Sequence, residues 1–139
     1  MSHPVRHAAK RLPLKRVDAR LSSKESTEQD ISAHDQLVAV KASLEAVSAS
    51  LSTVDPASLA DAEHVTWSNQ LNQVDLAIAR VRNSLLNGIV AAFEKELPQI
   101  QQRTARLEAD LAQLTRAVDV INAVAAALGV IEQIVMLGL

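Results

Sequence analysis

The stretch that decides the fold runs from Asp55 to Phe93 and reads DPASLADAEHVTWSNQLNQVDLAIARVRNSLLNGIVAAF. It opens on an Asp-Pro turn and holds the only Trp and the only Phe of the chain. The spacing between its apolar residues alternates between four and three positions, as in a helix that packs along one face. We therefore expect a helix over about 58–97, capped by Ser58 or Asp61, with Gly88 inside it at a close approach or a local bend. The predicted seam consists of Trp67, Leu71, Val74, Ile78, Val81, Leu85, Gly88 and Ala92.

The residues before this stretch predict a first helix over about 30–54. Its apolar positions follow the same spacing and form a narrow stripe, which indicates one main partner helix. The helix should end at Val54, because the residue before Pro56 is pushed out of the helical region. The stripe consists of Leu37, Val40, Leu44, Val47, Leu51 and Val54.

A third helix is predicted over about 98–137. Pro98 suits the first turn of a helix, although the sequence leaves open whether it marks a turn or a kink. The seam of this segment is the longest of the three and ends where Glu132 falls on it. It consists of Ile100, Thr104, Leu107, Leu111, Leu114, Val118, Ile121, Ala125 and Leu128.

Composition supports an all-α fold. The 139 residues fit one domain, and three Gly, four Pro and very few aromatic residues favour thin packing between long helices over hairpin-linked strands. We expect an elongated helical hairpin or three-helix bundle with coiled-coil-like seams over 30–139. Residues 1–29 carry half of the 14 Lys and Arg residues and are expected to form a disordered basic tail before an acidic body.

No catalytic or metal-binding signature is present. The chain has no Cys, and it lacks HExxH, GxSxG and phosphate-binding Gly loops. His3 and His7 are spaced for one helix face, but Pro4 argues against a helix there. His34 and His64 are expected near helix starts on the surface. The chain is therefore predicted not to be an enzyme and to need no cofactor or metal.

The predicted site is instead a set of interaction residues along the seams and turns. Trp67 is interpreted either as an anchor packed between the first two helices or as a contact for another subunit. The set consists of Pro56, Trp67, Leu71, Ile78, Leu85, Gly88, Phe93, Leu107, Leu114 and Ile121.

One resemblance adds to this reading. The loop Asp55-Pro56-Ala57-Ser58-Leu59-Ala60-Asp61 and the apolar segment 85–93 resemble the needle and inner-rod subunits of bacterial type III secretion systems. The segment 67–81, with Ala77-Ile78-Ala79, is also similar to their small helical co-chaperones. The resemblance implies self-assembly or subunit binding in an export apparatus. Because the chain continues beyond Phe93, it favours an accessory role over the needle itself.

The leading hypothesis is thus a non-enzymatic helical assembly protein that binds a protein partner or itself. The alternative is a membrane-associated protein that uses its apolar residues 120–139 and its basic tail. The uncharged part of that segment, 120–131, is shorter than the roughly 18–20 residues of a membrane-spanning helix, and no secretory signal is expected. The residues alone leave the localisation unknown, and the resemblance implies the bacterial cytoplasm or a signal-peptide-independent export route. Nucleic acid is a weaker candidate, because the tail lacks aromatic residues and the body is acidic.

Overall fold

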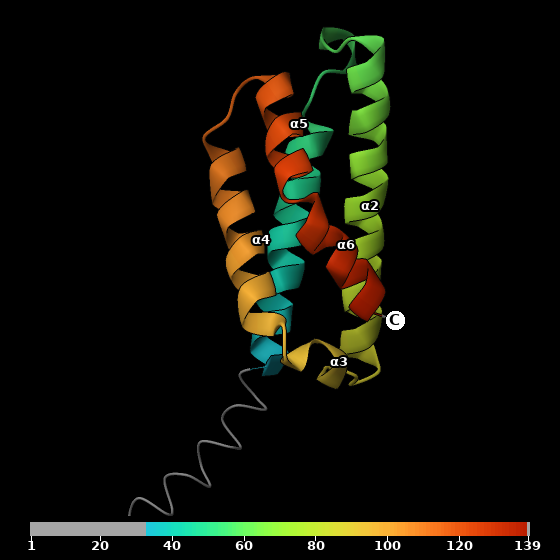
Figure 1. The fold of residues 1–139 in the computed structure, drawn as a ribbon, viewed down its shortest axis with the longest axis vertical. Coiled ribbons are helices and arrows are strands. Elements are labelled where there is room, and N and C mark those ends of the chain that lie inside the picture. The colour runs from blue at the N-terminus through green and yellow to red at the C-terminus, as the bar shows by residue number, and fades with distance from the viewer. Residues whose placement is uncertain (1–32, 139) are drawn as a thin grey trace, which may run out of the picture. The chain divides into compact units, whose positions relative to one another are not determined.

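The computed structural model describes residues 33–138, and these residues form helices joined by short turns, with no strand among them (Figure 1). The all-α prediction is confirmed. The predicted tail over 1–29 and the expected start of the first helix lie outside the described residues. After an N-terminal helix over 33–52, the elements are η1 (Pro56–Ser58), α2 (Asp61–Leu86), α3 (Ala91–Glu94), α4 (Leu97–Ala112), α5 (Ala117–Ala126) and α6 (Leu128–Leu137).

These helices fold back and forth along one bundle. The N-terminal helix, α2, α4 and the α5–α6 pair lie side by side, and successive segments run in opposite directions (Figure 1). Both α2 and α4 pack against α5 and against α6. The short α3 joins the end of α2 to the start of α4. The chain therefore builds a bundle from four segments, where the sequence predicted two or three helices.

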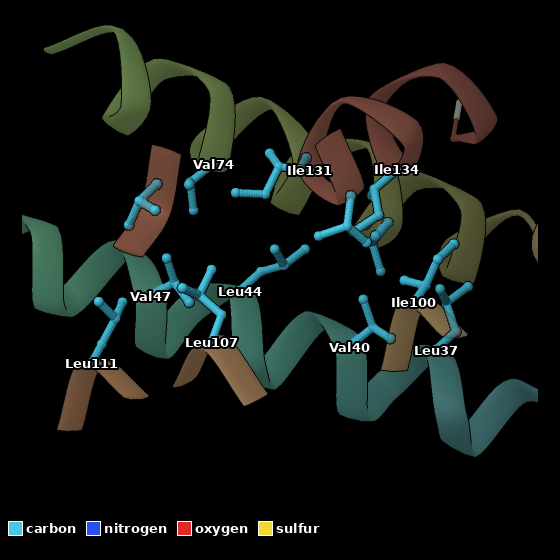
Figure 2. Close-up of a cluster of buried hydrophobic side chains, with 14 of the residues drawn as sticks. Leu37, Val40, Leu44, Val47, Val74, Ile100, Leu107, Leu111, Ile131 and Ile134 are labelled. Carbon is cyan, nitrogen blue, oxygen red and sulfur yellow. The ribbon is translucent and has the colours of Figure 1, made fainter. Parts of the chain in front are cut away.

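The N-terminal helix supplies the best-predicted part of the core. Leu37, Val40, Leu44, Val47 and Leu51 are fully buried, and Val54 is nearly so. Leu44 and Val47 face Leu107 and Leu111 of α4 in the same cluster (Figure 2). Each fully buried aliphatic side chain contributes about 1.5–3 kcal/mol relative to an exposed one. The predicted stripe on this helix is confirmed in full.

The turn after the N-terminal helix is built from local hydrogen bonds. The carboxylate of Asp55 accepts a 3.0 Å bond from the backbone N–H of Ala57, and the hydroxyl of Ser58 donates to the carbonyl oxygen of Asp55 at 2.7 Å. Ala60 then occupies the N-cap position of α2, where its N–H donates to Glu63 at 2.9 Å. The expected caps, Ser58 and Asp61, were wrong by one or two positions because Glu63 reaches back instead.

The predicted helix over 58–97 ends early, at Leu86. Gly88 adopts φ 65°, the left-handed conformation that glycine tolerates best. Its N–H donates to the carbonyl oxygen of Leu85 at 3.2 Å, and the N–H of Ile89 donates to that of Ser84 at 2.8 Å. This pair of bonds is the Schellman pattern that terminates helices. Gly88 is therefore a helix stop, and its predicted place inside a helix was wrong.

The predicted helix over 98–137 is also divided. Pro98 is the second residue of α4, where its missing N–H costs no helical hydrogen bond, so it marks a helix start. The buried face of α4 matches the predicted seam from Ile100 to Leu111. The chain then leaves the helix over 113–116, although no Gly or Pro stands there. Folding α5 and α6 back against α2 and α4 buries apolar surface that one extended helix would leave in water.

Candidate interaction surface

The buried face of α2 is rotated from its predicted position. It centres on Val74, Ala77 and Val81, with the polar Gln70 and Ser84 at its two ends. Leu71, Ile78 and Leu85 lie half-buried beside it and pack against the core. The rotation arises because α2 also packs against α5 and α6, and these contacts bury a different face of the helix.

The predicted seam included Val74 and Val81 of this face, and the polar Gln70 explains why a hydrophobic pattern missed its N-terminal end. The side chain of Gln70 is 3% exposed, and its Nε2 donates a 2.9 Å hydrogen bond to the carbonyl oxygen of Ile121 in α5. A second polar tie joins α2 to the N-terminal helix, where the Ser48 hydroxyl donates to the Asp75 carboxylate at 2.9 Å. Both bonds set how α2 lies against its neighbours.

The predicted interaction residues fall into three environments. Phe93, Leu107 and Ile121 are buried, so most of their contacts are made within the chain. Leu71, Ile78, Leu85, Leu114 and Trp67 are half-buried against the core. Pro56 and Gly88 are exposed, in the turns that precede and follow α2. The sequence therefore placed most of this set where the bundle packs on itself.

Trp67 is an intramolecular anchor. Its indole N–H donates a 2.8 Å hydrogen bond to the carbonyl oxygen of Leu51, in the last turn of the N-terminal helix. The ring of His64 meets it edge-on, with centroids 5.4 Å apart. The last carbonyls of a helix lack intrahelical partners, so a donor from a neighbouring helix is stabilising there. These contacts agree with the interpretation of Trp67 as an anchor between the first two helices, and its role as a contact for another subunit stays a prediction.

The outer face of α2 carries a feature that sequence reasoning missed. Val65, Leu76 and Leu86 are 60%, 40% and 78% exposed on the side away from the core. Together with the polar residues between them they continue the three-and-four spacing of a helix seam. The signal was present in the sequence, but three Asn residues obscured it. We name this set the α2 outer stripe; it consists of Val65, Asn69, Asn72, Leu76, Ala79, Asn83 and Leu86.

The other exposed large apolar side chains are more scattered. Met136, at 86%, is the most exposed of them and lies near the end of α6. Ile89 follows α2, Val118 lies at the start of α5 and Val38 on the N-terminal helix. Single exposed apolar residues are normal on a protein surface. Only the α2 outer stripe repeats with helical spacing over a whole helix in the described part of the chain.

The described residues offer little for metal binding or membrane crossing. No group of three or more His, Asp or Glu side chains among residues 33–138 could hold a metal ion. No single helix in the same range is long and apolar enough to cross a bilayer, and only α5 and α6 together, bent by 53°, meet that test. Most large apolar side chains of this pair, such as Val124 and Ile131, are buried in the bundle core.

Comparisons with protein families, with curated proteins and with solved structures find no match. Function must therefore be inferred from the surface of the bundle.

Proposed function

We propose that this chain is a non-enzymatic helical assembly protein, which binds a partner helix or a second copy of itself along the α2 outer stripe. The observation that carries the proposal is the exposure of Val65, Leu76 and Leu86 at seam spacing on one face of α2. Burying that face against another helix removes apolar surface from water, at about 25 cal/mol per Å².

The composition of the stripe is typical of a surface that pairs with one helix in one register. Asn69, Asn72 and Asn83 alternate with its apolar members, and polar residues on a seam fix register and partner number at a cost in stability. Charged residues flank the stripe, with Asp75 on one side and Arg80 on the other. These are the positions at which coiled coils choose partners through charge.

The test is the effect of Leu76→Asp on association, measured by sedimentation equilibrium over a wide concentration range. A charge placed in a buried helix pair is strongly unfavourable, so we expect the variant to dissociate about tenfold or more readily than the wild type. Val38→Asp is the matched control, because Val38 is 44% exposed but lies on the N-terminal helix. A wild-type chain that stays monomeric throughout, and binds no helical partner through α2, would contradict the proposal.

The type III secretion resemblance narrows this proposal to an accessory or structural subunit of an export apparatus. What supports it is that the 55–61 loop leads into α2, which is bonded to the preceding N-terminal helix through Ser48 and Asp75, as in a helical hairpin. The 85–93 segment departs from the resemblance, because α2 ends at Leu86. The chain would then act in the bacterial cytoplasm or leave by the same export route. Titration against a purified needle subunit tests it. Binding weakened by Leu76→Asp is expected, and absence of binding would remove this narrower role.

The alternative is association with a membrane through the apolar C-terminal segment. The bent α5–α6 pair favours it by length and composition. Its cost is high, because Val120, Val124 and Ile131 would have to leave the core. Deleting 120–139 would therefore unfold the bundle rather than test binding. Met136→Asp and Val118→Asp change exposed positions instead, and this alternative requires both to reduce co-sedimentation with anionic vesicles.

A further inference from the structure

The break between α5 and α6 opens a hollow beside α4. Its volume is about 470 Å³, and it lies between Arg103, Arg106 and Leu107 of α4 and Ala126, Ala127 and Gly129 of the α5–α6 junction. This volume is within the range of about 300–1,000 Å³ that small-molecule sites occupy. No predicted site residue other than Leu107 lines it, and the proposed assembly function does not use it.

The floor of the hollow and the wall opposite α4 are apolar. Leu107 is buried beneath the hollow, while the opposite wall consists of Ala123, Ala126, Ala127, Gly129 and the buried Val130. A Cβ added at Gly129 would meet no atom within 4 Å, so the space beside this residue is open. Bulkier residues at the junction would fill the hollow. Its size is therefore a direct consequence of small side chains at the bend.

The α4 side of the hollow is charged and carries two guanidinium groups, of Arg103 and Arg106, and one carboxylate, of Asp110. Arg103 and Arg106 are exposed and stand about one helical turn apart on α4. Neither forms an ion pair with another described residue; those recorded within 33–138 join His34 to Asp35 and Lys41 to Glu45. Two guanidinium groups at this spacing can both donate to one carboxylate or phosphate. The two guanidinium groups outnumber the Asp110 carboxylate at the hollow and are not paired with it, so the site keeps a net positive charge for an anionic head.

We propose that this hollow binds an amphiphilic anion, a single alkyl chain that carries a carboxylate or phosphate. Arg103 and Arg106 hold the anionic head, and the chain lies over Leu107 and the alanines of the opposite wall. A partner helix fits less well, because it needs a continuous apolar strip. The outward residues of α4 beyond the hollow, such as Gln99 and Gln102, are polar and exposed, and so is Gln113, which follows the helix.

Calorimetric titration with dodecanoate, below the concentration at which it self-associates, tests the proposal. We expect saturable binding of one dodecanoate per chain. Acetate has the head without the chain, and dodecyl maltoside has the chain without the charge, so both should bind far more weakly. The double variant Arg103→Gln/Arg106→Gln should lose about tenfold or more in affinity. Arg82→Gln/Arg116→Gln removes the same charge elsewhere and should bind as the wild type does.

A second pair of variants tests the site by its shape. Ala126 is exposed at the hollow, so Ala126→Trp should fill it and abolish binding while the melting temperature stays near that of the wild type. Ala105→Trp places the same ring on the other side of α4 and should leave binding intact. Unchanged affinity in Ala126→Trp, or equal binding of dodecyl maltoside, would overturn the proposal.

The anion could reach the site free in solution or within a bilayer. Vesicles of phosphatidylglycerol and of phosphatidylcholine separate these sources. Binding to phosphatidylglycerol vesicles without binding of monomeric dodecanoate would mean that the occupant is a membrane surface, and the proposal would fail. Leu76→Asp should leave dodecanoate binding unchanged, so failure of this site is distinguishable from failure of the assembly function.

Discussion

The indole N–H of Trp67 donates a 2.8 Å hydrogen bond to the carbonyl oxygen of Leu51, and this contact joins the middle of the fold-deciding stretch to the end of the preceding helix. The same carbonyl accepts a longer bond, 3.2 Å, from the N–H of Val54. Trp67 therefore closes the hairpin of the N-terminal helix and α2 near the Asp55 turn.

Trp67→Phe tests this anchor. The substitution keeps an aromatic ring between the two helices but removes the donor, and the remaining bond from Val54 keeps the carbonyl of Leu51 partly satisfied. We expect the free energy of unfolding to fall by about 1 kcal/mol, measured by urea denaturation. His64→Ala is the control for the ring contact and should cost less. A Trp67→Phe variant as stable as the wild type would show that packing alone provides the anchor.

Substitution by alanine at two glycines with equally open surroundings should change the free energy of unfolding in opposite directions. Gly88 has φ 65° and ends α2, whereas Gly129 is helical in α6, and an added Cβ meets nothing within 4 Å at either position. Gly88→Ala should lower the free energy of unfolding by about 1–2 kcal/mol, because an L-residue is strained in the left-handed region. Gly129→Ala should raise it by up to about 1 kcal/mol through helix propensity. Thermal melts followed by circular dichroism measure both, and equal signs would contradict the assigned end of α2.

Substitutions of Gln70 test how a buried polar side chain affects stability. Its Nε2 is bonded to Ile121, but its Oε1 is buried without a hydrogen-bond partner. Gln70→Leu removes both polar groups at similar volume, so we expect stability to be unchanged or raised by about 1 kcal/mol. Gln70→Ala should instead lower it by about 1–2 kcal/mol, because it leaves a cavity. Destabilisation by Leu as large as that by Ala would mean that the bond to Ile121 outweighs the cost of the unpaired oxygen.

Two positions on α2, two residues apart, should separate folding from assembly. Ile78 packs half-buried against the core, and Leu76 lies on the outer stripe. Ile78→Asp should lower the free energy of unfolding by about 2–3 kcal/mol, whereas Leu76→Asp should change it by less than about 0.5 kcal/mol. Chemical denaturation at low protein concentration measures both. If Leu76→Asp were the more destabilising of the two, the assigned orientation of α2 would be wrong.

Local patterns in the sequence predicted the buried residues correctly where a helix packs its apolar face against the core. The stripe from Leu37 to Val54 has a strict spacing and large aliphatic residues, and all of it is buried. The seam from Ile100 to Leu111 behaves in the same way. Asp55-Pro56 also predicted a chain reversal correctly, because the restriction that proline places on the preceding residue is a local steric effect.

The same patterns failed where the outcome depended on residues far along the chain. Leaving the helix over 113–116 needs no Gly or Pro, because antiparallel packing of α5 and α6 outweighs the modest helix propensity of a few residues. The rotation of α2 toward Gln70 has the same cause, since its amide is bonded to Ile121, 51 positions away. The hollow beside Arg103 also exists only because a bend at Ala127 lies next to α4.

The sequence by itself thus determined that the chain is helical, where its Asp-Pro turn lies and which face of the N-terminal helix is buried. Local sterics and side-chain spacing act within a few residues, so these features can be predicted from the sequence alone. Only the tertiary structure decided that two long segments divide and that Val65, Leu76 and Leu86 remain outside. Those outcomes follow from which distant surfaces bury one another, and no local spacing encodes that choice.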